Sequence, residues 1–170
     1  GIEGARYTRC LVADLQNDRY DDVVMLGDRG SHLFKFATNG VVRDMSRFSR
    51  VDTLKAVEGV LGDIDFSGKL DLLAIQPEDA GLKIFRNLGS LYFKDITATS
   101  GVPAKVEGSV RMLLDDWNND DMLDLFIARR DQPPLFMQKH RGAPHAPTNA
   151  IPNAPTAGVI ATGDLNNDMR

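Results

Sequence analysis

The sequence predicts an all-β fold built from β-propeller blades of four antiparallel strands, and two regularities support this fold. An aspartate-rich loop recurs along the chain, beginning at Asp14, Asp63, Asp116 and Asp164, which are 49, 53 and 48 residues apart. A period near fifty residues is typical of propellers and solenoids, in which each unit buries its apolar face against its neighbours. Each complete loop also lies between two short apolar runs of strand length.

The first two strands of each unit are predicted on either side of the loop. In the first unit the apolar runs are residues 10–13 before the loop and 23–26 after it. An EF-hand is excluded, because its loop carries a glutamate at position 12 and is flanked by helices. Position 12 is apolar in every complete copy, as Met25, Ala74 and Ile127.

The third and fourth strands are predicted from a repeated leucine and from turn residues. A leucine lies 19 residues after the first aspartate of each complete loop, at Leu33, Leu82 and Leu135. This constant offset predicts a third strand in a repeated register. Asn39 and Gly40 then predict a tight hairpin between residues 32–36 and 41–45, because this pair tolerates positive φ. In the second unit, residues 88–90 take the same part, so each unit has the four strands of a propeller blade.

The loops carry candidate metal ligands at positions 1, 3, 5 and 9. These are Asp14, Gln16, Asp18 and Asp22 in the first loop, Asp63, Asp65, Ser67 and Asp71 in the second, Asp116, Asn118, Asp120 and Asp124 in the third, and Asp164, Asn166 and Asp168 in the incomplete fourth. With a peptide carbonyl between them, such side chains offer the six or more hard oxygen ligands that Ca²⁺ takes. Any one loop can be an ordinary aspartate-rich turn. Ligands repeated in phase predict calcium sites.

The residue at the sixth loop position and the quality of the ligands rank the three complete loops as candidate calcium sites. The chain turns sharply there, and glycine tolerates the positive φ that this turn requires. The second loop alone has glycine, at Gly68, but its ligand Ser67 is weak. The first loop has Arg19 and the neutral ligand Gln16, which makes it the weakest candidate. The third loop, with three carboxylates, is expected to be the strongest.

The loops, together with residues 82–89 and 93–97, resemble FG-GAP/VCBS repeats, as found in integrin α-subunit propellers and, more closely, in bacterial extracellular proteins of the ASPIC/UnbV kind. The resemblance covers nearly the whole chain and is weakest over residues 142–158. It implies a β-propeller, commonly of seven blades, with calcium in the blade loops and a role in adhesion or ligand binding. At 170 residues the chain holds about three and a half blades, so we expect a partial propeller that needs further blades.

Composition and single residues narrow the function. A net charge of −4 without a basic stripe argues against nucleic acid, and no apolar run is long enough to span a bilayer. Weak oxygen sites fill where calcium is millimolar, which places the protein at the cell surface, outside the cell or in the periplasm. Cys10 is expected to be a small buried residue, and His140 and His145 are expected to be exposed. No nucleophile and base occur in a recognisable arrangement, so the chain is not expected to be an enzyme.

Two features are candidates for binding a partner. Residues 142–158 contain four of the eight prolines and are expected to form an irregular loop or a sheet-edge strand, which is either a tolerated insertion or the place where binding specificity resides. Trp117 either packs against a neighbouring blade or offers an exposed stacking surface. The expected function is a calcium-binding extracellular module that binds a protein or glycan ligand through its face loops. Two alternatives stay open: a propeller of a glycan-active protein, such as a lectin or polysaccharide lyase, and a scaffold of a cell-surface assembly.

Overall fold

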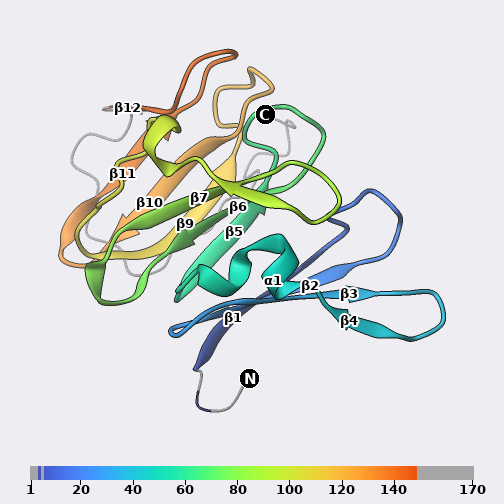
Figure 1. Cartoon of the computed structure of the whole chain (residues 1–170). Helices are drawn as coiled ribbons and strands as arrows, with labels where there is room; N and C mark the ends of the chain where they lie inside the picture. The colour runs from blue at the N-terminus through green and yellow to red at the C-terminus, as the bar shows by residue number, and fades with distance from the viewer. Residues whose placement is uncertain (1–3, 5, 149–170) are drawn as a thin grey trace, which may run out of the picture.

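The computed structural model describes Gly4 and residues 6–148, and over this part of the chain the strands form three four-stranded antiparallel sheets (Figure 1). The first sheet contains β1 (Tyr7–Ala13), β2 (Asp22–Gly27), β3 (His32–Phe36) and β4 (Val42–Asp44). The second contains β5 (Glu58–Gly62), β6 (Asp71–Ile75), β7 (Leu82–Asn87) and β8 (Phe93–Asp95). The third contains β9 (Ser109–Asp115), β10 (Asp124–Arg129), β11 (Gln132–Gln138) and β12 (Ala146–Thr148). The predicted all-β fold with four antiparallel strands per unit is confirmed.

The sheets are arranged as propeller-like blades. Within each sheet the strands follow one another in chain order. The first strands lie next to each other, because β5 contacts both β1 and β9. Figure 1 shows the sheets side by side in chain order, from blue through green to orange. The seven-bladed ring stays a prediction.

Short helical turns connect the strands. The helix α1 (Ser46–Ser49) and the 3₁₀ turn η1 (Val51–Thr53) lie between β4 and β5. A second turn, η2 (Pro77–Asp79), lies between β6 and β7, and a third, η3 (Thr97–Thr99), lies between β8 and β9. The connections between sheets therefore run through α1, η1 and η3.

The core consists of two layers, one on each side of the second sheet. The strand β6 shows the division, because successive side chains of a strand point to opposite faces. Leu72 and Ala74 belong to the layer shared with the first sheet, and Leu73 and Ile75 to the layer shared with the third. All four are 3% exposed or less. This explains why β6 is a continuous apolar run rather than an alternating one.

The register predicted for the third strands is wrong. The leucines at the constant offset pair with different positions of the second strand, as Leu33 with Val24, Leu82 with Ile75, and Leu135 with Ile127. The residues in equivalent register are Phe34, Phe85 and Met137, each opposite the residue that follows the ninth loop position. The connections between second and third strands differ in length, so equal spacing along the chain does not give equal register.

The hairpin predicted around Asn39 and Gly40 is confirmed, since β3 and β4 pair there. Gly40 has a φ of 74°, whereas Asn39 is not among the residues with positive φ. The Gly40 amide donates to the Ala37 carbonyl at 2.9 Å, and the Ala37 amide donates to the Val41 carbonyl at 3.1 Å. One left-handed residue is therefore enough for this turn.

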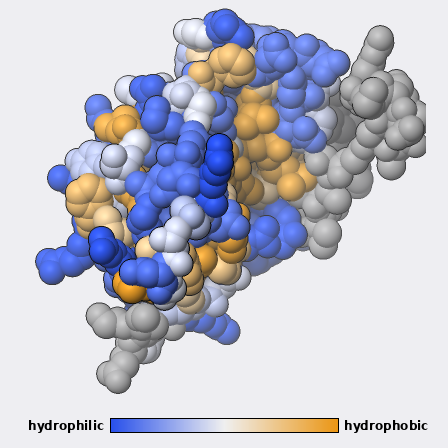
Figure 2. Space-filling view, turned by 90° about the vertical axis from the view of Figure 1, so that its right-hand side faces the viewer, coloured by the Kyte–Doolittle hydropathy of each residue, from blue (hydrophilic) through white to orange (hydrophobic). Residues whose placement is uncertain are grey.

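Cys10 is exposed, so its predicted burial is wrong. It pairs with Met25 on the face of the first sheet that points away from the second sheet. The same sheet bears other exposed apolar side chains, namely Val12, Phe36 and Val42. On the face of the molecule shown in Figure 2, hydrophobic residues lie in patches between hydrophilic ones.

Part of the proline-rich segment is regular. Residues 146–148 form β12, the outer strand of the third sheet, in which Pro147 pairs with Met137. Proline is tolerated here because an edge strand needs fewer amide donors. The edge strand, one of the two structures expected for this segment, is therefore confirmed for residues 146–148, and residues 149–158 lie outside the described residues.

Candidate metal centre

In each of the three complete loops, the first aspartate fixes the shape of the loop. Its carboxylate accepts hydrogen bonds from the amides of the fifth and sixth positions. For Asp63 these bonds are 2.8 Å from the Ser67 amide and 2.6 Å from the Gly68 amide. The sixth residue has positive φ in every complete loop, at Arg19 (70°), Gly68 (78°) and Asp121 (66°). The predicted sharp turn at the sixth position is confirmed.

The ninth aspartate of each loop is buried at the start of the second strand. Asp22, Asp71 and Asp124 are 1%, 0% and 0% exposed. The Leu15 amide donates to Asp22 Oδ2 at 3.3 Å, and the Lys139 amide donates to Asp124 Oδ1 at 2.8 Å. The other oxygen of each carboxylate, Asp22 Oδ1 and Asp124 Oδ2, has no hydrogen-bond partner among the described residues. A buried oxygen without a partner is costly, so these two atoms fit a cation.

The charges of these carboxylates are poorly compensated. Burial raises the pKa of Asp22 to about 6 and that of Asp71 to about 7, and it also raises the pKa of Asp124. The neighbouring carboxylates Asp65 and Asp63 raise the pKa of Asp71 further. A cation placed between such groups would favour their charged form and lower these pKa values.

The second loop brings its carboxylates together. One carboxylate oxygen from each of Asp63, Asp65 and Asp71 lies within 4.8 Å of the other two. Among the described residues, no other group of three or more acidic, histidine or cysteine residues brings its ligand atoms this close together. Ser67 Oγ, a further predicted ligand, is buried without a hydrogen-bond partner. This group can hold a metal ion. Arg86 also forms an ion pair through Nε with Asp65 Oδ2, although the geometry is not that of a hydrogen bond.

The first loop already contains a positive charge. Lys35 Nζ lies 2.5 Å from Asp18 Oδ2 and also donates a hydrogen bond to Gln16 Oε1. These atoms belong to loop positions 5 and 3, two of the predicted ligands. The ammonium group therefore lies where these side chains would meet a metal.

In the third loop, Asp120 bonds to other side chains. Asn118 Nδ2 donates to Asp120 Oδ2 at 3.1 Å, and His140 Nδ1 lies 3.1 Å from the same oxygen. His140 is exposed, as expected. The sequence ranked the third loop first, but the structure gathers the carboxylates of the second. The fourth loop, with Asp164, Asn166 and Asp168, lies outside the described residues.

Three residues at the loops were missed by the sequence analysis, namely Lys35, Arg86 and His140. Lys35 and Arg86 lie on the third strands of their sheets, and His140 follows the third strand of the third sheet. Their distance along the chain from the loops hides the contact. The correct register between the second and third strands would have placed Lys35 and Arg86 beside the loops. The equal spacing of the leucines predicted a different register.

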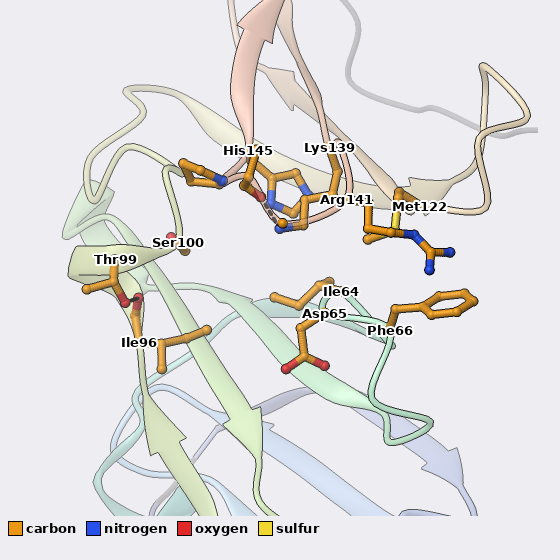
Figure 3. A pocket seen from close by; sticks show the side chains of 13 residues that line it. Ile64, Asp65, Phe66, Ile96, Thr99, Ser100, Met122, Lys139, Arg141 and His145 are labelled. Atoms are coloured by element: carbon orange, nitrogen blue, oxygen red, sulfur yellow. Dashed lines mark hydrogen bonds between the residues drawn. The ribbon is translucent and has the colours of Figure 1, made fainter.

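A pocket of about 530 Å³ lies between the second loop and the connection from β11 to β12 (Figure 3). Phe66 and Asp65 lie on one side of it, and Lys139 and Arg141 face them from the other. The Arg141 guanidinium carbon lies 4.7 Å from the centre of the Phe66 ring. The pocket therefore combines an exposed aromatic ring with two cations beside a candidate metal site.

The wall of this pocket is anchored by His145. The prediction that His145 is exposed is wrong, since it is only 3% exposed. Burial lowers the pKa of His145, so its ring is neutral near pH 7, and its Nε2 lies 3.1 Å from the Leu123 carbonyl. Its amide donates to the Ser100 carbonyl at 3.0 Å. Gly101 permits this approach, because a Cβ atom there would lie 2.2 Å from the His145 carbonyl oxygen.

Trp117, in the third loop, packs within its own sheet. Its ring lies 5.1 Å from that of Phe136 and 6.1 Å from that of Phe126, between ring centres. It is 38% exposed. The tryptophan therefore combines packing with partial exposure, and its contacts are to β10 and β11.

No protein-family model matches this chain. No curated protein matches it either. No helix among the described residues is long and apolar enough to cross a membrane. The function is therefore inferred from the loops and the pocket themselves.

Proposed function

We propose that this chain is a calcium-binding β-propeller segment that acts outside the cytoplasm as an adhesion or ligand-binding module. The observation that carries this proposal is the convergence of Asp63 and Asp65 on the buried Asp71, whose pKa is raised to about 7. The unpartnered oxygens of Asp22 and Asp124 repeat the pattern in the other two loops.

The ligand chemistry favours calcium over other metals. The group contains only carboxylates, whereas zinc in proteins is usually bound through histidine and cysteine. Magnesium needs a tight octahedron and gives up water reluctantly, so an irregular loop with a neighbouring Ser67 suits calcium better. Such loops bind calcium with dissociation constants on the order of 10⁻⁴ to 10⁻³ M, which fits an extracellular, cell-surface or periplasmic location.

In this proposal the cation has a structural role. A metal held by Asp63, Asp65 and Asp71 would fasten the loop to the start of β6, because Asp71 is the first residue of that strand. The same loop contributes Phe66 and Asp65 to the pocket. A bound calcium ion would therefore hold one wall of the pocket in place, which lowers the entropic cost of binding a partner.

The pocket supports an acidic glycan as the ligand. Its volume of about 530 Å³ falls within the range of small-molecule sites. Lys139 and Arg141 make no ion pair with another described residue, so their positive charges favour a carboxylate ligand, although Lys139 Nζ already donates to the Ala143 carbonyl. Phe66, which is 55% exposed and has the Arg141 guanidinium over its ring, adds apolar surface beside these charges.

The test is binding to an array of neutral and acidic glycans, in calcium and in EDTA. We expect retention of uronate-containing glycans in calcium, a large loss in EDTA, and at least a tenfold loss in Arg141→Ala. Arg43→Ala, in the exposed strand β4, is the control and should bind normally. Turnover of a polysaccharide would favour the lyase alternative, and the absence of any glycan or protein ligand would favour the scaffold.

A further inference from the structure

One residue on the third strand of each sheet lies beside the ninth-position aspartate of the loop. In the first sheet Lys35 pairs with Asp22. In the second and third sheets the outermost pairs are Phe85 with Leu72 and Met137 with Leu125, and continuing this register by one residue places Arg86 beside Asp71 and Gln138 beside Asp124. The three positions are structurally equivalent, although their spacing along the chain differs. They carry a lysine, an arginine and a neutral amide, so the charge next to the loop changes from sheet to sheet.

In the first sheet, the lysine reaches the candidate ligands. Lys35 Nζ lies 2.5 Å from Asp18 Oδ2 and donates to Gln16 Oε1. Its charge also acts on the buried carboxylate of Asp22, whose pKa it lowers against the larger effect of burial. The Lys35 side chain is 25% exposed, so the ammonium group lies in the loop rather than in bulk water.

We propose that Lys35 is a built-in cation that takes the place of a metal in the first loop, an inference that rests on the proposed calcium function. An ammonium group supplies one positive charge and three hydrogen-bond donors. It can therefore satisfy the oxygens of Gln16 and Asp18 that would otherwise bind calcium. Calcium could enter this loop only by displacing the lysine.

The second loop is an intermediate case. Arg86 makes its ion pair with Asp65 alone among the three clustered carboxylates. Asp63 and Asp71 remain available to a metal. The arginine competes for one ligand, whereas the lysine of the first loop contacts two.

The third loop is without such a cation on its third strand, because Gln138 is neutral. His140 contacts Asp120 from beyond the end of β11, and its side chain is 64% exposed. We therefore assign the lowest metal dependence to the first loop, where the cation on the third strand contacts two candidate ligands.

The first test replaces Lys35 by the residue of the third sheet. Lys35→Gln should bind one more calcium ion per chain than the wild type, as measured by equilibrium dialysis or calorimetric titration. Lys83→Gln is the matched control, because Lys83 lies on β7 and its ion pair with Asp95, at 2.7 Å, is outside the loops. It should leave the calcium stoichiometry unchanged.

The reverse substitution, Gln138→Lys, should weaken metal binding in the third loop at least tenfold. Trp117 is the single tryptophan of the chain and lies at the second position of that loop. Terbium, a luminescent substitute for calcium, should therefore be sensitised by tryptophan excitation in the wild type. This signal should fall in Gln138→Lys and stay unchanged in Lys35→Gln.

The outcomes separate the two proposals. If the wild type binds calcium but Lys35→Gln gains no ion, the lysine does not replace a metal and the inference is overturned. Retention of the terbium signal at its full affinity in Gln138→Lys would also overturn it. If neither the wild type nor either variant binds calcium, the proposed function fails and this inference fails with it.

Discussion

Glu58 is a buried carboxylate that joins the first strands of the three sheets. It lies 3.2 Å from Arg9 Nε on β1 and 3.8 Å from Arg111 Nη2 on β9. The three residues occupy equivalent positions, since Arg9, Glu58 and Arg111 pair with Leu26, Ile75 and Ala128 in the second strands. A single acid therefore balances charges from both neighbouring sheets.

We expect Glu58→Gln to lower the free energy of unfolding by about 1–2 kcal/mol, because two arginines lose their partner. The value is below that for a fully buried pair, since both arginine side chains are more than a third exposed and are screened by water. Urea denaturation measures the change. The exposed pair of Lys83 and Asp95 is the comparison, and an equal or larger loss in Lys83→Gln would contradict this role of Glu58.

Asp71 predicts how stability depends on pH without metal. Its pKa of about 7 in the folded protein lies above the value of about 3.9 for an exposed aspartate. The folded state therefore binds more protons than the unfolded state between these values, and stability should fall as the pH rises from about 4 to 7. Melting curves in EDTA across this range measure the slope. Asp71→Asn should flatten the profile, and a wild-type stability that rose with pH over the same range would contradict the assignment.

The loop as an element depends on its sixth residue. Arg19 has a φ of 70°, a conformation that costs little for glycine and more for arginine. Arg19→Gly should therefore stabilise the protein by up to about 1 kcal/mol, and Gly68→Ala should destabilise it by a similar amount or more. Chemical denaturation in EDTA isolates this backbone effect from metal binding. If Arg19→Gly were less stable than the wild type, the contacts of the Arg19 side chain would stabilise the fold by more than its positive φ destabilises it.

For the strands, their positions along the chain could be predicted from the sequence, but the register in which they pair could not. The apolar runs that became β2, β6 and β10 were predictable, because each follows an aspartate-rich loop. Their register against the third strands was not, since β6 is apolar on both faces and a shift exposes no polar residue. The candidate ligands of the loops were visible as a repeat, whereas Lys35 and Arg86 reach the loops through that unpredicted register.

The whole molecule presents one face that resembles an interface between blades. Cys10 and Val12 on β1 correspond by register to Gly59 and Leu61 on β5, which face the first sheet. Val12 is 58% exposed and Val42 49%. The further blades expected from the repeat would bury this surface by the same packing that joins the first and second sheets.

Cys10 reports on that packing. In the chain of 170 residues, it should react with a thiol reagent at the rate of an exposed cysteine. In a longer form with a blade against the first sheet, we expect at least a tenfold slower reaction, because the side chain would be covered. A rate that is equal in both forms would show that no blade packs on this face.

The central claim is that the loops bind calcium, and the most direct measurement is thermal unfolding in calcium, magnesium and EDTA. Calcium at a hundredfold excess over its dissociation constant should stabilise the protein by about 2.7 kcal/mol for each independent site. Magnesium should have a much smaller effect, because the irregular loops do not offer its octahedron. A melting temperature that rises in calcium and is lost in Asp71→Ala is the expected result. Equal melting temperatures in all three solutions would contradict the account.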